Sequence, residues 1–309
     1  MTVVLRTRGL RKTYGDVVAL QGLDLEVSRG EVFGFLGPNG AGKTTFTKCV
    51  TGFVRPDAGE VEIAGVDALR HTTEAAYHVG LVPDQYDFYP NLTGRQHLDF
   101  YGRLLGMEPG HRKDRIGQVL ALVRMEERAD TRVKGYSHGM KQRICIAQAL
   151  LHEPELIFFD EPTNGLDPQG AYELREMIKG LAHDGTTVFL NSHQLNEVEQ
   201  TCQRVAILHR GVLKAVAPVR DLQQRASAGG GAVRLRVLNP TAKLTAALEK
   251  AVAGVVLDGD TYAFPGDADA TAAAVSAAVK AGGKVIGVRQ ETATLESAFL
   301  ELVQGGEAR

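Results

Sequence analysis

The segment Gly37-Pro-Asn-Gly-Ala-Gly-Lys-Thr44 constrains this 309-residue chain more than any other feature. It follows an apolar run, residues 31–36, that is typical of a buried strand, and it precedes an apolar segment that predicts a helix. Glycines at positions 37, 40 and 42 let the backbone curl so that consecutive N–H groups point inward. The next helix adds the positive end of its dipole. This pattern predicts a phosphate-binding loop.

The residues of this loop have separate chemical tasks. The Lys43 ammonium is placed to reach the β and γ phosphates of a nucleotide, and the Thr44 hydroxyl is placed to ligate Mg²⁺. A glycine-rich turn without a ligand is the plain alternative, which the complete spacing and the strand-to-helix context disfavour. We expect nucleotide binding by Gly37, Pro38, Asn39, Gly40, Ala41, Gly42, Lys43, Thr44 and Thr45.

Two adjacent carboxylates are expected to complete this site. Asp160 ends a second apolar run, residues 155–160, and Glu161 follows directly. We expect Asp160 to hold Mg²⁺ through water, and Glu161 to accept a proton from the water that attacks the γ-phosphate. Alternatively, Asp160-Glu161-Pro162 is simply a strand end that caps a turn. The presence of the phosphate loop makes this interpretation the weaker of the two.

Four further motifs occur in order along the chain. They are Lys12-Thr-Tyr-Gly15, Tyr136-Ser-His-Gly-Met-Lys-Gln142, Pro162-Thr-Asn-Gly-Leu-Asp167 and Asn191-Ser-His193. With these motifs, residues 2–211 resemble the ATP-binding-cassette (ABC) ATPases, which carry an aromatic residue under adenine, a signature, a D-loop and a switch histidine in this order. The resemblance implies a P-loop NTPase fold and ATP hydrolysis with Mg²⁺.

The resemblance also implies which residues contact ATP from the opposite subunit. In this family the signature and the D-loop have that role, which assigns it here to Ser137, His138, Gly139 and Asp167. His138 stands where the family usually has glycine. Ser137 also begins a predicted helix, where a serine ordinarily caps the helix, and the two roles are compatible.

Three more side chains receive roles from the resemblance. His193 is expected to bind the γ-phosphate and orient the attacking water, although a lone loop histidine is more often simply solvated. Tyr14 is expected to stack on adenine, the alternative being a packing aromatic in a turn. Asp84 occupies the place of the usual Q-loop glutamine and is expected to ligate Mg²⁺ or its water. An acidic residue there resembles the branch of the family that serves exporters.

Alternating apolar strands and helices predict an α/β domain with a largely parallel sheet over residues 1–217. A capping box at Thr93–Gln96 and an apolar stripe of Ile116, Val119, Leu120 and Val123 predict a helical subdomain over about residues 86–151. Small residues predict a linker over 218–231. Beyond it, the order β-α-β-β-α-β-α predicts a small C-terminal α+β domain of split βαβ type over 232–309.

Composition excludes several classes of protein. The 35 Lys and Arg against 37 Asp and Glu give a net charge of −2, which does not indicate a nucleic-acid binder. Cys49, Cys145 and Cys202 follow no metal-binding spacing and predict reduced thiols in a cytoplasmic protein. We expect no secretory signal and no membrane span, since no apolar run approaches the roughly 20 residues that a span needs.

One phosphate loop and one signature per chain predict that two chains combine, as a homodimer or with a similar ATPase, around two ATP. The resemblance implies integral membrane permease subunits as partners, no nucleic acid, and a peripheral position at the cytoplasmic face of the membrane. Residues 294–301 also resemble exporters of the drug, antibiotic and polysaccharide class. The alternatives are an importer ATPase or a soluble ABC ATPase acting on ribosomes or DNA. A kinase or GTPase would have no use for the signature.

Overall fold

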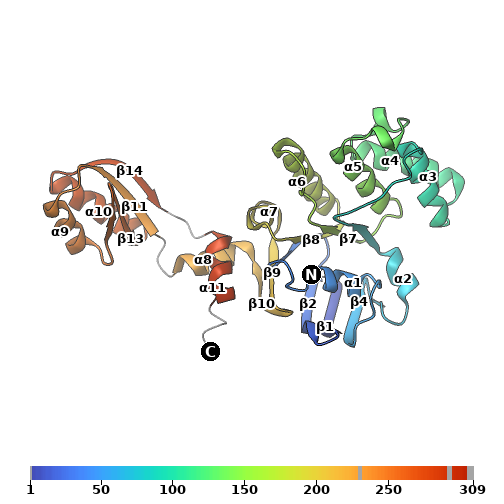
Figure 1. Cartoon of the computed structure of the whole chain (residues 1–309), viewed down its shortest axis with the longest axis horizontal. Helices are drawn as coiled ribbons and strands as arrows, with labels where there is room; N and C mark the ends of the chain where they lie inside the picture. The colour runs from blue at the N-terminus through green and yellow to red at the C-terminus, as the bar shows by residue number, and fades with distance from the viewer. Residues whose placement is uncertain (1, 229–231, 291–293, 305–309) are drawn as a thin grey trace. The chain divides into compact units, whose positions relative to one another are not determined.

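The computed structural model describes residues 2–228, 232–290 and 294–304. The chain divides into two compact units, unit 1 (Met1–Val216) and unit 2 (Ala217–Arg309). Each unit has its own hydrophobic core, and each is described by itself (Figure 1).

A largely parallel sheet forms the centre of unit 1. Its spatial order is β10, β9, β3, β8, β7, β6. The strands are β3 (Val32–Leu36), β6 (Val79–Val82), β7 (Leu156–Asp160), β8 (Thr187–Ser192), β9 (Arg204–His209) and β10 (Val212–Pro218). Strand β3 is parallel to β8 and β9, and β7 is parallel to β6 and β8. Every residue of β3 and β8 is buried, as the continuous apolar runs predict for strands covered on both faces.

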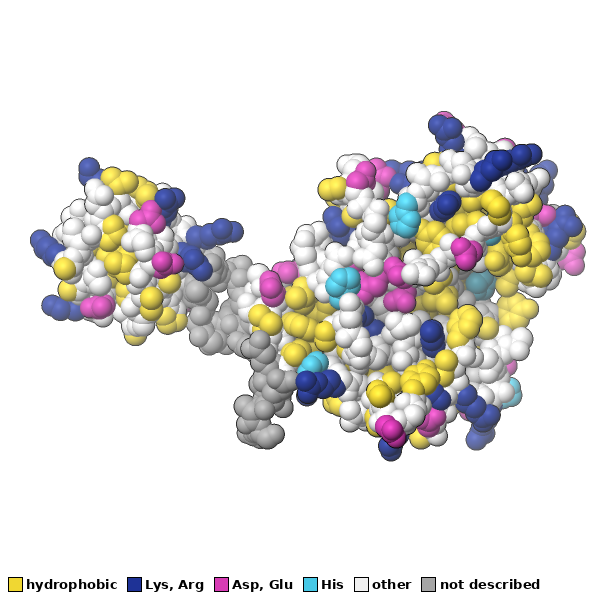
Figure 2. All heavy atoms as spheres, viewed as in Figure 1, with side chains coloured by type: hydrophobic (Ala, Val, Ile, Leu, Met, Phe, Trp, Pro, Cys, Tyr) yellow, Lys and Arg dark blue, Asp and Glu magenta, His cyan; other side chains and the backbone are white. Residues whose placement is uncertain are grey.

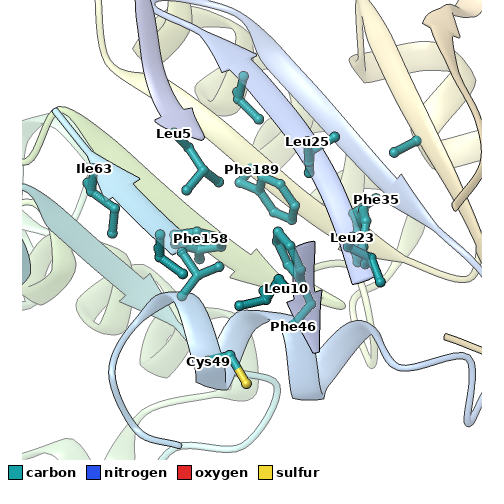
Figure 3. Packing of buried hydrophobic residues seen from close by; sticks show 14 of the residues in the cluster. Leu5, Leu10, Leu23, Leu25, Phe35, Phe46, Cys49, Ile63, Phe158 and Phe189 are labelled. Atoms are coloured by element: carbon teal, nitrogen blue, oxygen red, sulfur yellow. The ribbon is translucent and has the colours of Figure 1, made fainter. Parts of the chain in front are cut away.

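A second sheet of unit 1 is antiparallel, and the sequence analysis did not foresee it. Its order is β2, β1, β4, β5. The strands are β1 (Val3–Tyr14), β2 (Val17–Ser28), β4 (Ala58–Ile63) and β5 (Val66–Asp67), and helix α1 is Lys43–Val50. Leu5 and Leu23 from this sheet, Phe158 and Phe189 from the parallel sheet, and Phe46 from α1 share one hydrophobic core (Figure 3).

The helical region predicted between β6 and β7 is present. The helices of unit 1 beyond α1 are α2 (Thr72–Tyr77), α3 (Gly94–Leu104), α4 (Pro109–Leu122), α5 (His138–Ala149), α6 (Pro168–His183) and α7 (Leu195–Thr201), with 3₁₀ turns at Glu126–Arg128 and Val133–Gly135. Thr93 and Gln96 form the predicted capping box at the start of α3. All four residues of the predicted apolar stripe are buried. Helices α3, α4 and α5 lie together at one end of unit 1 (Figure 1).

Unit 2 begins with a helix where the sequence predicted a linker. Helix α8 (Val219–Ala228) occupies most of residues 218–231, and residues 229–231 lie outside the described part of the chain. The small residues near 226 were interpreted as a linker, but alanine is also the best helix former. Val219 and Leu222 are buried, and α8 packs against α11 (Leu295–Gln304). Residues 219–228 of the segment predicted as a linker, 218–231, thus form a helix.

Between α8 and α11 the chain forms an antiparallel sheet with the order β12, β13, β11, β14. The elements are β11 (Ala232–Leu238), α9 (Ala242–Ala251), β12 (Val256–Asp258), β13 (Thr261–Pro265), α10 (Ala268–Lys280) and β14 (Lys284–Gln290). Alternate residues of β11, beginning with Val233, join Tyr262 and Phe264 in a core with Leu244 and Leu248 of α9. This is the split βαβ arrangement.

The three cysteines, Cys49, Cys145 and Cys202, are free and buried. Burial raises the pKa of the Cys49 thiol to about 11 and that of Cys145 to about 12, which keeps both thiols protonated. Within residues 2–228, 232–290 and 294–304, no helix combines the length and the apolar character that crossing a membrane requires.

The core of unit 1 depends on Phe189, whose ring centroid lies 4.8 to 5.6 Å from those of Phe33, Phe35, Phe46 and Phe158. We expect Phe189→Ala to lower the free energy of unfolding by about 3–5 kcal/mol, because it leaves a cavity among these rings. Urea unfolding followed by circular dichroism measures the loss. Phe53→Ala is the matched control, since Phe53 is 72% exposed. Equal unfolding midpoints for the two variants would contradict the prediction.

Candidate nucleotide site

The predicted phosphate loop connects β3 to α1, and its glycines are required by close packing. A Cβ atom on Gly37 would lie 2.4 Å from the Leu208 carbonyl oxygen, and one on Gly42 would lie 2.5 Å from that of Ala19. Gly42 also has a φ of 111°, in the left-handed region that favours glycine. The loop therefore keeps its curled shape only with glycine at these positions.

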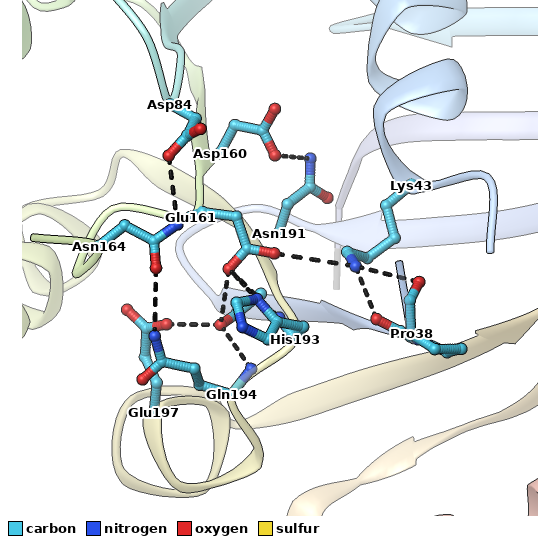
Figure 4. A network of polar contacts seen from close by, with 12 residues as sticks. Pro38, Lys43, Asp84, Asp160, Glu161, Asn164, Asn191, His193, Gln194 and Glu197 are labelled. Atoms are coloured by element: carbon cyan, nitrogen blue, oxygen red, sulfur yellow. Dashed lines mark hydrogen bonds and ion pairs between the residues drawn. The ribbon is translucent and has the colours of Figure 1, made fainter. Parts of the chain in front are cut away.

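Lys43 lies beneath this loop and is 7% exposed. Its Nζ donates a hydrogen bond to the Gly37 carbonyl at 2.6 Å and lies 3.8 Å from Glu161 Oε1 (Figure 4). Burial lowers the pKa of Lys43, and the negative charges of Glu161 and Asp160 oppose that change. An anion at this position would favour the charged ammonium in the same way.

Asp160 is the last residue of β7, and the neighbouring strand positions its carboxylate. Asn191 Nδ2, at the end of β8, lies 3.4 Å from Asp160 Oδ1 and 2.7 Å from Thr47 Oγ1 of α1. Burial, and then the charge of Glu161, raise the pKa of Asp160. A cation beside this carboxylate would relieve both effects.

The donors available near Asp160 fit Mg²⁺. Asp160, Asp84 and Thr44 line the same cavity, and all three offer hard oxygen atoms. No group of three or more His, Cys, Asp or Glu side chains suited to a metal occurs in the described part of the chain. Mg²⁺ needs no such group, because it commonly binds through one or two carboxylates, substrate phosphates and water.

Glu161 and His193 form a close pair. His193 Nδ1 lies 2.8 Å from Glu161 Oε2, and the His193 backbone N–H donates to the same oxygen at 3.3 Å. The Glu161 side chain is 13% exposed and that of His193 is 43% exposed. Glu161 has a φ of 49°, which is uncommon for a residue with a side chain. The backbone conformation thus turns Glu161 toward His193 and Lys43.

The phosphate loop and the carboxylates line one cavity of about 550 Å³. Acidic side chains and histidines gather near the middle of unit 1 in the space-filling view (Figure 2). Sequence reasoning missed other residues of this cavity, namely Val17, Val18, Ala19, Gln21, Arg210 and Gly211. Those from β2 belong to the second sheet, which the sequence did not indicate, and Arg210 and Gly211 come from the turn between β9 and β10.

Of the predicted loop residues, Ala41 is buried, and its carbonyl accepts a hydrogen bond from Gly211.

The signature and the D-loop line a different cavity of unit 1, of about 420 Å³. Ser137, His138, Gly139 and Asp167 all contribute to it. Ser137 caps α5 by accepting from Met140 N at 3.3 Å, and Asp167 caps α6 by accepting from Gly170 N at 2.7 Å. The four residues predicted to act in trans are thus together, and apart from the phosphate loop.

Asn164 of the D-loop connects the loops that surround both cavities. Its Nδ2 donates to Asp84 Oδ1 at 3.2 Å, and its Oδ1 accepts from Gln194 Nε2 at 3.3 Å. Its carbonyl oxygen lies 3.2 Å from His138 Nε2, and the His138 ring stacks on Tyr86. His138, which replaces the usual glycine, therefore makes specific contacts within its own chain.

Tyr14 lies at the end of β1 and is 46% exposed. The ammonium of Lys12 is 5.5 Å from the centroid of its ring. Tyr14 is not among the residues that line the phosphate cavity, although Val17, three residues later, is. Its stacking on adenine stays a prediction.

Comparison with known proteins yields one consistent family. The ABC transporter family matches residues 20–164. The chain is 38% identical over 222 residues to the linearmycin resistance ATP-binding protein LnrL of Bacillus subtilis (strain 168), covering 72% of this chain and 71% of the relative. It is 35% identical over 299 residues to the daunorubicin resistance ATP-binding protein DrrA3 of Streptomyces coeruleorubidus, covering 95% and 94%.

A solved structure agrees with these relatives. The dimeric ATP-binding cassette MJ0796, in a post-hydrolysis state bound to ADP and Pi, superposes with a TM-score of 0.62 at 26% identity. The match covers 69% of this chain and 98% of the cassette. The likeness to DrrA3 includes nearly the whole chain and is not confined to the phosphate loop. This chain therefore belongs to the ABC transporter family, as an ATP-binding subunit.

Proposed function

We propose that two such chains hydrolyse ATP in a shared nucleotide sandwich, and that this reaction powers export through a separate membrane permease. The separation of the two half-sites carries the proposal. Lys43 and Glu161 line one cavity, whereas Ser137 and Asp167 line another. An ATP site that needs both halves can be completed only by a second copy, or by a similar ATPase, in a closed head-to-tail arrangement.

Within one half-site, Glu161 is the general base. Water must lose a proton as it attacks the γ-phosphate, and the Glu161 carboxylate lies at the edge of the phosphate cavity to receive it. His193 holds Oε2 of this carboxylate and would orient the water. Lys43 would exchange its contact with the Gly37 carbonyl for phosphate oxygens.

Thr44 and Asp160 would hold Mg²⁺, with Asp84 close by. When bound, the cation neutralises negative charge on the β and γ phosphates. Asn191 Nδ2 donates a hydrogen bond to Asp160 Oδ1, which orients this carboxylate for the cation. Because Asn164 also fixes Asp84, the D-loop is connected to the metal ligands of its own chain.

In the second half-site, the start of α5 would face ATP of the other chain. Ser137, His138 and Gly139 stand at its N-terminal end, where backbone N–H groups and the helix dipole favour an anion. ATP would supply charged contacts that only the closed dimer makes, and hydrolysis would remove them. The nucleotide would thus shift the population between closed and open states.

The likeness to resistance and export proteins supports export of a drug, antibiotic or other hydrophobic or amphipathic compound. Because no described helix could cross a membrane, the path would be supplied by integral permease subunits. This chain would then act at the cytoplasmic face of the membrane as a peripheral subunit.

Glu161→Gln should keep ATP binding and lower kcat by about 10²–10⁴-fold, because the amide cannot accept the proton. Phosphate release and equilibrium nucleotide binding measure the two effects separately. Glu127→Gln, at an exposed site, makes the same chemical change and should leave both unchanged. Turnover by Glu161→Gln at the wild-type rate would rule out this base.

Ser137→Arg should prevent ATP-induced dimers while each chain still binds ATP, because a bulky side chain would replace a donor to the opposite nucleotide. Size-exclusion chromatography with ATP in the Glu161→Gln background measures the dimer. Ser137→Asp is the companion variant, since it keeps a helix cap but places a negative charge toward phosphate. Dimers formed by both variants would contradict the role in trans.

An affinity-tagged chain, solubilised from its native membranes in detergent, should recover a polytopic membrane protein in stoichiometric amount, identified by mass spectrometry. That protein would be the permease. Recovery only with ribosomes or in soluble fractions would contradict the transporter function and favour a soluble ABC ATPase.

A further inference from the structure

Glu197 on α7 is a buried carboxylate that the mechanism above does not use. It is 4% exposed, and its Oε2 lies 2.6 Å from the Ser192 hydroxyl at the end of β8. Its other oxygen, Oε1, accepts no hydrogen bond of acceptable geometry, although the hydroxyl of Thr163 is close enough to favour its charged form. A buried carboxylate oxygen that carries charge but accepts no hydrogen bond is strongly disfavoured.

Ser192 stands between Glu197 and the catalytic carboxylate. Its Oγ is 2.6 Å from Glu197 Oε2 and 3.4 Å from Glu161 Oε2, and it accepts from the Gln194 backbone N–H at 3.0 Å (Figure 4). A hydroxyl has one proton to donate and two lone pairs that accept. It therefore cannot donate to both carboxylates.

The charge state of Glu197 decides which hydrogen bonds the Ser192 hydroxyl can make. If Glu197 is ionised, Ser192 donates to its nearer oxygen, and a Ser192 lone pair then faces the negative Glu161 Oε2. If Glu197 is protonated, Ser192 accepts from Glu197 and from Gln194 and donates to Glu161. Only the second arrangement satisfies the hydroxyl completely.

The surroundings of Glu197 favour the protonated form. Burial raises the pKa of Glu197, and the negative charge of Glu161 acts in the same direction. The hydroxyls of Ser192 and Thr163 and the positive charge of Arg175 on α6 oppose this rise without cancelling it. Cys202, at the end of α7, stays a neutral thiol because burial raises its pKa well above the usual value.

We propose that Glu197 is a positioning residue whose protonated carboxyl donates a hydrogen bond to Ser192, which in turn donates to the catalytic carboxylate of Glu161. This inference rests on the proposed function, in which Glu161 is the general base. Glu161 Oε2 then receives Ser192 Oγ–H together with the backbone N–H and the ring of His193, while Oε1 is left facing Lys43. The chain of bonds fixes the direction of the base, and no covalent bond changes in it.

Infrared difference spectroscopy tests the proton directly. The spectrum of the wild-type chain minus that of Glu197→Gln, taken near neutral pH, should show the carbonyl stretch of a protonated carboxylic acid. Carboxylate bands in its place would overturn the proposal. Glu199→Gln on the same helix is the matched control for the spectral change that the substitution of glutamate by glutamine itself produces.

Steady-state ATPase measurements test the role of this proton. Glu197→Gln should keep kcat, because its amide also donates to Ser192. Glu197→Ala should lower kcat by about 10- to 100-fold, with little change in KM because Glu197 does not line the ATP cavity. Ser192→Ala should lower kcat as much, and the double variant no further.

Wild-type kcat in Glu197→Ala, or additive losses in the double variant, would overturn the proposal. If Glu197→Ala does not fold, the infrared spectrum and the kcat of Glu197→Gln still test the proposal. A large loss of kcat in a folded Glu197→Gln would also overturn it. A failure of the proposed function is distinguishable, because it would appear as full activity in Glu161→Gln whatever Glu197 does.

Discussion

The parallel pairing of β3 with β8, and of β8 with β7, determines where Lys43, Asp160 and Glu161 lie in the nucleotide site. Leu36 pairs with Ser192, and Asp160 pairs with Asn191. Parallel strands present their carboxyl ends at one edge of the sheet, so segments distant in sequence meet there. A slip of one residue in β7 would turn Asp160 to the opposite face of the sheet. The apolar residues that fix this register thus also fix the chemistry at its edge.

Burial then sets the electrostatics at that edge. It lowers the pKa of Lys43 and raises that of Asp160, so that each group is less favourably charged than it would be in water. The two charges compensate one another only in part across the cavity. Phosphate and a divalent cation would supply the missing charge of each sign. The fold therefore favours binding of the phosphates and the cation of a nucleotide, independently of any contact with its base or ribose.

The sequence was sufficient to locate the segments whose structure depends on local spacing. The phosphate loop, the acidic strand end and the capping box at Thr93 are each contained within a few residues, and periodicity located the buried strands beside them. It was not sufficient where contacts depend on pairing between distant segments. The second sheet joins β1 to β4 across more than one intervening element, and it brings Val17 and Ala19 to the cavity. The contact of Glu197 with Ser192 depends on how α7 packs against β8. Composition favoured a linker over residues where α8 forms instead.

The packing of α8 against α11 has a consequence for the order in which the chain matures. The whole β11–β14 module lies between these two helices in sequence, so α8 leaves the ribosome well before its partner. At a synthesis rate of roughly 5–20 residues per second, α11 is synthesised on the order of seconds after α8. Unit 1 and the intervening module can fold independently in that interval. Until translation has passed Leu295, α8 lacks the helix against which it packs.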